Sequence, residues 1–368
     1  MLPSCDVAPV LTTLSMTPLQ QYLTDAGGVV TVEAFMRWAL YDPQTGYYSR
    51  RIADVGRSGD FSTSATLSPA LAQAIAAWAK SHREEVIQDG RWHLIEVGPG
   101  NGAVAAEILR SLGGWTRRRL TYHLIETSIP LAERQREKLG EWGGGPFSPT
   151  LRWHSDLESA LREADGAALI VSNELVDAFP CAVFARDTTS ELWREVSIHL
   201  DATRQRATET LVDLSSERAA EVQSATHSLP RSVARIEIHL SFRDWLRGWR
   251  PLWKKGRMLT IDYGGTIATL YHRRPRGTLR GYFRQQRIEG EEIYERPGHQ
   301  DLTADVNFTD LIRWGEAESL AAQPLQTQRD FLMKWNALPR VTDAATAHLL
   351  DPIGAGAAFK VLEQTPQP

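Results

Sequence analysis

Three glycines follow directly on a run of apolar residues in the segment 94–102, whose sequence is LIEVGPGNG. The helix-forming run 103–109 comes next. A ligand at the carboxyl edge of a strand must approach the backbone closely, and Gly98, Gly100 and Gly102 lack the Cβ atoms that would block it. A strand, a glycine turn and a helix in this order indicate a site for a nucleotide cofactor.

Polar residues stand at the ends of this strand and of the next two apolar runs. Glu96 precedes the glycine turn, where a carboxylate suits a cationic group such as the amino group of a methionyl moiety. Glu126 follows the second run, and an acid there can accept both hydroxyl protons of a ribose. Asp156 follows the third run and is placed to recognise an adenine amino group. With Asn101 in the turn, these residues are predicted to bind an adenosyl cofactor.

The glycine turn also fits a second class of cofactor. Gly98, Gly100 and Ala103 match the spacing of the dinucleotide fingerprint, so an NAD-dependent oxidoreductase is the main rival interpretation. Glu96, the proline between the glycines and the long stretch of chain before the first strand all favour a methyl donor.

Further motifs follow one another between about residues 35 and 362. They are FM at 35–36, DP at 42–43, GYY at 46–48, GDF at 59–61, EVGPGNG at 96–102, SNELVDAFP at 172–180, DYG at 262–264, GTLR at 277–280, GHQDLT at 298–303 and FKV at 359–361. In this order they resemble a bacterial-type member of the MidA-like methyltransferase family, whose eukaryotic mitochondrial members assist respiratory complex I assembly by methylating an arginine of a subunit. The resemblance implies a seven-stranded methyltransferase sheet, S-adenosyl-L-methionine as donor and a protein nitrogen, arginine in particular, as acceptor.

The fourth apolar run covers residues 167–171. The segment that follows it is the predicted catalytic segment. Asn173 and Glu174 should emerge at the carboxyl edge of the sheet, beside the glycine turn. Methyl transfer needs in-line placement of a nucleophile, and a guanidinium, whose pKa exceeds about 12, must also lose a proton. Glu174 and Asp177 are three residues apart, so on a helix they would share a face and help to bind and deprotonate such a group. Asn173, Glu174 and Asp177 are the predicted catalytic residues, although turn and cap roles would also explain Asn173 and Asp177.

Other parts of the resemblance leave alternatives open. Gly59, Asp60 and Phe61 are predicted to fold over the methionyl end of the cofactor as a lid, or else to form a structural loop. Gln285 stands where such proteins tend to carry His, and the run DVNF at 305–308, with Asp305 and Asn307, stands where they tend to read His and then Asp before Phe. A third interpretation is therefore a non-catalytic assembly factor that holds a partner through its arginine-rich stretch, 273–287.

The elements that must position these residues alternate between strands and helices, which is typical of a doubly wound, Rossmann-like α/β sheet. Strands are expected at 93–97, 121–125, 150–153, 167–171, 257–261 and 359–362, and helices begin near Ala103, Pro130, Leu157 and Leu175. We divide the chain into an N-terminal segment of helices and loops that packs on the core (1–90), a cofactor-binding half (91–182), an inserted subdomain with a connecting helix (183–256) and a C-terminal half with the arginine-rich loop (257–368). The insertion is expected to cover one edge of the sheet, and a helix after Pro69 to pack on the main domain.

Composition narrows the classes of function. With 42% hydrophobic and 23% charged residues the chain should be globular, and its net charge of −4 argues against nucleic acid as the main partner. The two cysteines form no disulfide framework, and the ten histidines show no metal-ligand spacing, so no metal is predicted. The first residues resemble no targeting peptide, and no run is apolar enough to span a bilayer. We expect a cytoplasmic enzyme that does not enter the membrane and acts on a protein.

Overall fold

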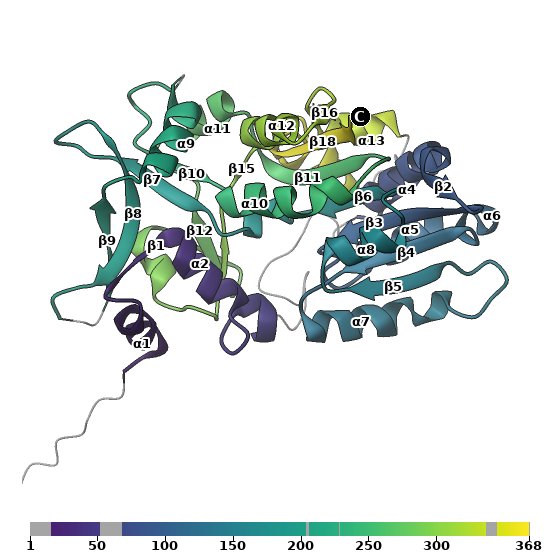
Figure 1. Ribbon diagram of the computed structural model, residues 1–368, viewed down its shortest axis with the longest axis horizontal. Coiled ribbons are helices and arrows are strands. Elements are labelled where there is room, and N and C mark those ends of the chain that lie inside the picture. Colours follow the sequence, from purple (N-terminus) through teal and green to yellow (C-terminus); the bar gives the residue numbers. More distant parts are fainter. Residues whose placement is uncertain (1–15, 52–67, 204–205, 228, 336–343, 368) are drawn as a thin grey trace, which may run out of the picture.

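A largely parallel sheet forms the centre of the molecule (Figure 1). Within the described residues, which are 16–51, 68–203, 206–227, 229–335 and 344–367, seven strands lie side by side in the order β5, β4, β3, β6, β11, β18, β16. On this path β18 runs antiparallel to both of its neighbours. The strands are β3 (Arg91–Val97), β4 (Leu120–Ile125), β5 (Thr150–His154), β6 (Leu169–Asn173), β11 (Met258–Gly265), β16 (Leu320–Ala322) and β18 (Phe359–Pro366), extended by β2 (Ile87–Gln88), β15 (Val306–Asn307) and β17 (Gln326–Thr327).

Helices cover both faces of this sheet, which is why its parallel strands are near-continuous apolar runs in the sequence. One face packs against α4, α5 and α13, and the other against α8, α10 and α12. The helices are α1 (Pro18–Asp25), α2 (Val32–Tyr41), α4 (Ala70–His82), α5 (Ala103–Ser111), α6 (Gly114–Arg117), α7 (Ile129–Leu139), α8 (Leu157–Glu163), α9 (Ser216–Thr226), α10 (Leu240–Trp249), α11 (Ile267–Arg273), α12 (Phe308–Ala317), α13 (Gln328–Lys334), α14 (Ala344–Leu350) and α15 (Ala355–Ala358).

The predicted α/β fold class is confirmed. All six predicted strands overlap observed ones, namely β3, β4, β5, β6, β11 and β18. The helices expected near Ala103, Pro130 and Leu157 are α5, α7 and α8, which begin within one residue of those positions. The helix after Pro69 is α4, and its Trp78 indole donates to Glu363 of β18 at 3.2 Å, so it packs on the main domain as expected.

The helix predicted near Leu175 is wrong. Only the short 3-10 turn η4 (Val176–Ala178) forms there. Glu174 has a left-handed φ of 51°, which starts a turn instead of a helix. Pro180 stops any continuation, because a proline disfavours helical backbone in the residue before it, and Phe179 is extended.

The insertion builds a sheet of its own. Its strands β7 (Ala182–Arg186), β8 (Trp193–Leu200), β9 (Ala207–Val212) and β10 (Arg235–Ile238) pair antiparallel. The N-terminal strand β1 (Val29–Thr31) pairs with β8 at the edge of this sheet. The N-terminal segment therefore also contains a strand, and it joins the insertion as well as the core.

Part of the arginine-rich stretch is folded into a small third sheet. Strands β12 (Arg280–Phe283), β13 (Gln286–Ile288) and β14 (Asp301–Thr303) pair antiparallel. Arg280 is buried, and its guanidinium donates to Asp305 at 2.6 Å. Arg274 reaches the same carboxylate at 3.2 Å. These two arginines bind an internal acid, which reduces the basic surface that the sequence suggested for holding a partner.

None of the helices in the described part of the chain combines the length and the apolar character that a membrane span requires.

Candidate functional site

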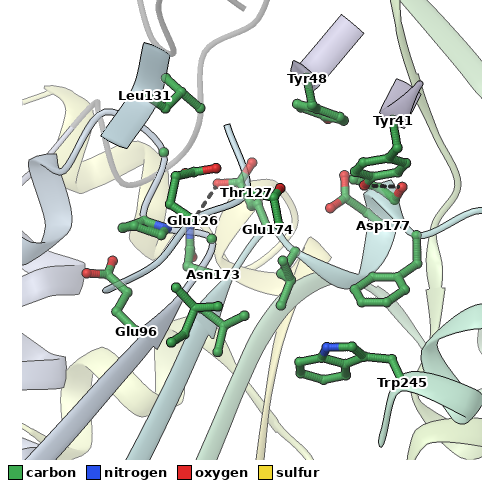
Figure 2. Close-up of a pocket in the computed structure, with 18 of the residues that line it drawn as sticks. Tyr41, Tyr48, Glu96, Glu126, Thr127, Leu131, Asn173, Glu174, Asp177 and Trp245 are labelled. Atoms are coloured by element: carbon green, nitrogen blue, oxygen red, sulfur yellow. Dashed lines mark hydrogen bonds between the residues drawn. The ribbon is translucent and has the colours of Figure 1, made fainter. Parts of the chain in front are cut away.

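A cavity of about 1110 Å³ opens at the carboxyl ends of the parallel strands (Figure 2). The loops after β3, β4, β5 and β6 form one half of it, and α2, α10 and the third sheet contribute to the other half. The predicted site residues that line it are Glu96, Gly98, Gly100, Asn101, Glu126, Asp156, Asn173, Glu174 and Asp177. Gly102 does not line the cavity, and Gly59, Asp60 and Phe61 lie outside the described residues.

At the glycine turn, backbone without side chains lines the cavity. Gly98 and Gly100 have φ values of 69° and 54°, which favour glycine. A Cβ on Gly98 would lie 2.9 Å from the Leu175 side chain, so a larger residue would also disturb the catalytic segment. Gly102 has a φ of 75° and caps α5, so it turns the chain into the helix behind the cavity.

Glu96 places a buried carboxyl group beneath the turn. It is 3% exposed, and the Tyr122 hydroxyl donates to its Oε2 at 2.8 Å. Burial raises the pKa of Glu96 to about 7, against the lowering effect of the Tyr122 hydrogen bond and with a smaller contribution from the charge of Glu126. A carboxyl group of this kind gains most from a cationic ligand, because a neighbouring positive charge offsets the cost of ionising it.

Glu126 is held by two donors at the next strand end. Ser128 N donates to its Oε1 at 2.8 Å, and Gln135 Nε2 donates to its Oε2 at 3.0 Å. Gln135 also donates to the carbonyl oxygen of Gly100 at 2.7 Å, so one side chain fixes the glycine turn and the acid together. Sequence reasoning missed Gln135. Its only sequence signal is a polar residue on the otherwise apolar stripe of α7 that includes Leu131 and Leu139.

Asp156 has a structural role besides its place at the cavity. Its Oδ1 accepts from Ser159 N at 2.7 Å and caps α8. Its Oδ2 accepts from the Ser155 hydroxyl at 3.1 Å. These hydrogen bonds lower the pKa of Asp156, so the group is an anion that offers its remaining lone pairs to the cavity.

Asn173 and Glu174 reach the cavity through a turn. The Asn173 Oδ1 is buried and has no hydrogen-bond partner in the described part of the chain, while its Nδ2 donates to Glu174 Oε1 at 3.3 Å. Glu174 N donates to the carbonyl oxygen of Ile261 at 2.9 Å, which fixes its left-handed backbone against β11. Glu174 therefore precedes η4, and the prediction that it shares a helix face with Asp177 is wrong.

Asp262 holds the following turn from inside the core. Its Oδ2 accepts from the backbone N–H groups of Leu175, Val176 and Asp177 at 3.2, 2.9 and 3.3 Å. Its Oδ1 accepts from Tyr263 N at 2.9 Å. Burial and the nearby charges of Asp177 and Glu174 raise the pKa of this carboxyl group. Asp262 therefore acts on the site by fixing the backbone of the catalytic segment.

Asp177 is buried at the far side of the cavity. Its Oδ2 accepts from the Thr303 hydroxyl at 2.7 Å and from the Tyr263 hydroxyl. Its Oδ1 is buried and has no partner among the described residues, so this oxygen is available to a ligand. Burial raises the pKa of Asp177, and the two hydroxyl donors and Arg280 partly oppose that shift.

A second acidic residue and several aromatic rings line the half of the cavity to which α2, α10 and the third sheet contribute. We call this half the acceptor side. The Tyr48 hydroxyl donates to Asp301 Oδ1 at 2.6 Å, and burial raises the pKa of Asp301 to about 7. The Tyr41 hydroxyl donates to the carbonyl oxygen of Ala178 at 2.9 Å. The other aromatic side chains of the lining belong to Phe179, Trp245, Tyr263, Tyr282 and Phe359. Sequence reasoning assigned no role to Asp301 or Tyr48, although both lie in motifs of the family resemblance.

The departures from the family pattern fall in different places. Gln285 lines the cavity, with a φ of 64°. Asp305 pairs with Arg280, as described above. The Asn307 side chain caps α12 and donates to Asp310 at 2.8 Å. Of the three, only Gln285 is among the residues that line the cavity.

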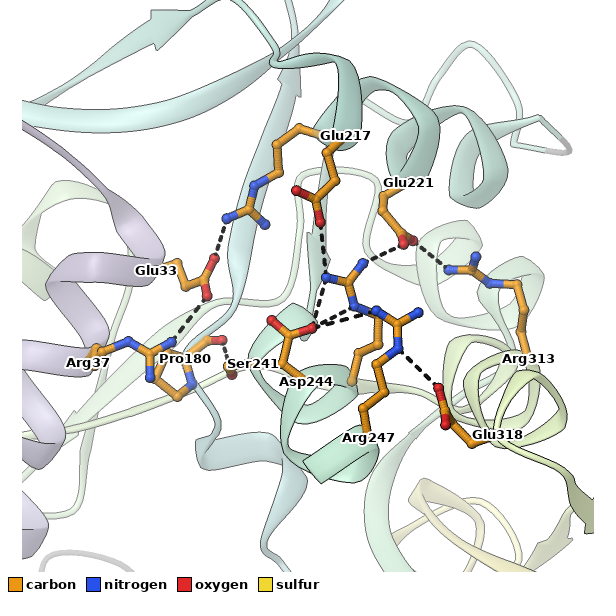
Figure 3. A network of polar contacts seen from close by, with 12 residues as sticks. Glu33, Arg37, Pro180, Glu217, Glu221, Ser241, Asp244, Arg247, Arg313 and Glu318 are labelled. Carbon is orange, nitrogen blue, oxygen red and sulfur yellow. Dashed lines mark hydrogen bonds and ion pairs between the residues drawn. The ribbon is translucent and has the colours of Figure 1, made fainter. Parts of the chain in front are cut away.

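Ion pairs tie the elements beside the acceptor side together (Figure 3). Glu33 of α2 pairs with Arg37 at 3.3 Å and with Arg218 of α9 at 2.7 Å. Arg243 of α10 pairs with Glu221 of α9 at 2.6 Å and with Asp244 at 2.9 Å. Arg37 and Asp244 line the cavity, so this network fixes two charged groups at its edge.

The lining as a whole is acidic. Its acidic residues are Glu96, Glu126, Asp156, Glu158, Glu174, Asp177, Asp244 and Asp301, and its arginines are Arg37 and Arg280. Such a lining suits a positively charged cofactor and a positively charged acceptor. The glycine turn, the Glu96 carboxyl group and the unpartnered Asn173 oxygen fit a ligand with a sulfonium and an ammonium group.

Comparisons with known proteins agree with this fit. Residues 70–325 match a family described as S-adenosyl-L-methionine-dependent methyltransferases. The chain is similar to the mitochondrial protein arginine methyltransferase NDUFAF7 of Danio rerio, with 28% identity over 329 residues, 83% of this chain and 73% of that one. Human NDUFAF7 is 27% identical over 347 residues, 86% of this chain and 73% of that one.

A solved structure also indicates a methyltransferase. A Burkholderia thailandensis protein crystallised with bound S-adenosyl-homocysteine superposes with a TM-score of 0.80 at 25% identity, covering 94% of this chain and 90% of that one. S-Adenosyl-L-methionine is thus the cofactor, and the NAD-dependent oxidoreductase is not supported.

Removing the Asp262 carboxyl group should destabilise the fold. Asp262→Ala leaves four backbone donors, two of them in buried and two in partly buried hydrogen bonds, without this acceptor, so we expect a loss on the order of 3 kcal/mol in the free energy of unfolding, measured by urea denaturation. Asp262→Asn keeps one acceptor oxygen and should lose less. Asp213→Ala, at an exposed aspartate, is the control and should change stability by less than about 0.5 kcal/mol. An Ala variant as stable as the native protein would contradict the role of Asp262.

Proposed function

The chain belongs to this family of S-adenosyl-L-methionine-dependent methyltransferases, and we propose that it methylates a side-chain nitrogen of a partner protein, with an arginine guanidinium as the acceptor. The observation that carries the proposal is the acceptor side. There the Oδ1 of Asp177, which has no partner in the described part of the chain, lies in a cavity that also contains Glu174 and Asp301. The names of the curated relatives support arginine as the acceptor.

Residues at the glycine turn hold and orient the donor. When bound, S-adenosyl-L-methionine supplies an electrophilic methyl group on a sulfonium. Glu96 pairs with the methionyl ammonium, Glu126 accepts the ribose hydroxyls, and the Asn173 oxygen offers a further acceptor beside the turn. Since the reaction is an in-line displacement, placing donor and acceptor at the right angle supplies much of the rate.

The carboxylates of the acceptor side bind the guanidinium and remove its proton. Asp177 accepts a charge-assisted hydrogen bond from the guanidinium through its Oδ1, which has no partner among the described residues, while its Oδ2 keeps the Thr303 and Tyr263 hydroxyls. The surrounding aromatic rings exclude water and favour a cation. Glu174, at the strand end, takes the proton that the nitrogen loses as the methyl group arrives.

Product analysis tests the proposed acceptor. The purified protein is incubated with labelled S-adenosyl-L-methionine and a bacterial lysate, and labelled proteins are hydrolysed to identify the methylated amino acid. We expect methylarginine. Label on another amino acid would overturn the acceptor, and no label in any protein would favour the non-catalytic assembly factor. The cytoplasmic location stays a prediction, since both curated relatives named above are mitochondrial.

Removing the Glu126 carboxylate should weaken cofactor binding. Glu126→Ala loses two charge-assisted hydrogen bonds to the ribose, on the order of 1.5–3 kcal/mol, so affinity for S-adenosyl-homocysteine should fall about tenfold to a hundredfold in calorimetric titration. Glu137→Ala, an exposed glutamate of the neighbouring helix α7, is the control. Equal affinities in the native protein and the Glu126 variant would refute the ribose assignment.

Cofactor affinity should depend on the protonation of Glu96. Its pKa in the free protein is about 7, and a bound ammonium lowers that pKa, so the pairing is complete above pH 7 and is lost as the pH falls. Affinity should decline between about pH 7 and pH 5, with a slope approaching about tenfold per pH unit. Glu96→Gln should abolish this decline, while Asp301→Asn, at the other carboxyl group with a similar pKa, should retain it. If the decline in affinity persists in Glu96→Gln, another titrating group causes it.

Glu174→Gln should impair turnover without impairing cofactor binding. The change is nearly isosteric and removes the charge, so methyl transfer should slow by roughly a hundredfold, the scale of a lost general base. Affinity for S-adenosyl-homocysteine should stay within about twofold, because the proposed cofactor contacts come from other residues. Full activity would remove Glu174 from the mechanism, and joint loss of binding and activity would place it at the cofactor.

A further inference from the structure

Three histidines lie in a row across neighbouring strands of the central sheet. His93 of β3 and His123 of β4 are joined by a hydrogen bond of 2.9 Å between Nδ1 and Nε2, and His123 Nδ1 and His154 Nε2 of β5 by another of 2.9 Å. Glu163 of α8 lies beyond them, with its Oε2 3.7 Å from His154 Nε2. Helix α8 packs on β4 and β5, which brings Glu163 to the row (Figure 1).

The geometry points to a binding site for one divalent first-row transition-metal ion of the zinc type, held by His123 Nδ1, His154 Nε2 and the Glu163 carboxylate. The three ligand atoms lie within 4.8 Å of one another. In a tetrahedral zinc site with bonds of about 2.0–2.2 Å, ligand atoms are about 3.3 Å apart, so small side-chain shifts suffice. Two imidazoles and a carboxylate leave a fourth position for water. This inference does not rest on the proposed function.

The surroundings of the three ligands match those of metal sites in proteins. A ligating histidine generally donates its other ring N–H to a neighbour, and His123 Nε2 faces His93 Nδ1 at 2.9 Å. The Glu163 Oε1 accepts from Arg152 Nε at 3.1 Å, which orients the carboxylate and leaves Oε2 toward His154. His123 and Glu163 therefore each have a partner that fixes the direction of the side chain.

The hydrogen bonds of the row are compatible with metal binding. The contact between His123 Nδ1 and His154 Nε2 requires one proton between these two nitrogens. If the protons of the His123 and His93 rings shift to their Nε2 atoms, lone pairs become free on His123 Nδ1 and His154 Nε2. A metal ion can then bind there without a net loss of protons.

A metal ion at this site would affect the cofactor cavity through the loop that follows β5. His154 ends β5, and the next two residues, Ser155 and Asp156, line the cavity. A metal ion bound at His154 would therefore fix the start of that loop. Separate elements supply the three ligands, which is why the spacing of histidines along the sequence shows no metal motif.

Cobalt titration of the purified full-length chain, after treatment with EDTA, tests the site. Co²⁺ replaces Zn²⁺ and gives a visible absorption band in tetrahedral sites, so we expect one Co²⁺ per chain, displaced by added Zn²⁺, and a higher melting temperature with Zn²⁺. Glu163→Gln and His154→Gln should lose the band, while His227→Ala, at an exposed histidine of the insertion, should retain it.

Two outcomes would overturn the site. Native protein that shows neither the cobalt band nor a shift in melting temperature with Zn²⁺ binds no such ion. A band that survives in both Glu163→Gln and His154→Gln belongs elsewhere in the chain. The melting temperatures of the variants without metal show whether each is folded, and Glu163, on the surface of α8, is the safer of the two positions.

Discussion

The shape of the catalytic segment depends on one buried carboxyl group, Asp262. Its two oxygens accept four backbone N–H groups, and three of these belong to consecutive residues of the turn after β6. This arrangement allows Glu174 to keep a left-handed backbone and points Asp177 into the cavity. Without such an acceptor, three amides at the end of a buried strand would be unsatisfied, and the chain would have to rearrange to reach water.

The same cavity contains carboxyl groups that ionise less readily than exposed ones. Burial raises the pKa values of Glu96, Asp177 and Asp301. In the free protein these groups are costly as anions, so a cationic ligand stabilises the folded state by pairing with them. The donor carries a sulfonium and an ammonium, and the proposed guanidinium acceptor carries a further positive charge. After methyl transfer the sulfonium becomes a neutral thioether, which weakens the attraction of the acidic lining for the spent cofactor and favours its release.

The cofactor half of the site that the sequence predicts is local in the chain. A strand, a turn and a helix are contiguous in the chain, so Glu96, the glycines and Glu126 can be placed from hydrophobic runs alone. On the acceptor side, the sequence predicts Asp177 from the motif that contains it. Tyr48 and Asp301 come from distant segments, and only the tertiary fold brings them to the cavity. The helix predicted at Leu175 failed because propensity does not register a capping carboxyl group 87 residues further along the chain.

The two halves of the cavity also draw on partly different regions of the chain. The glycine turn, Glu126 and Asn173 all fall within residues 70–325, the part of the chain that matches the methyltransferase family. Tyr41 and Tyr48 precede that part, and they reach the cavity because β1 joins the sheet of the insertion and α2 packs beside it. The N-terminal segment and the insertion are thus held to each other as well as to the core. Changes in either can alter the acceptor side while the glycine turn and its acid stay fixed by Gln135. In structural terms, the lining of the acceptor side is therefore separable from the proposed contacts to the methyl donor.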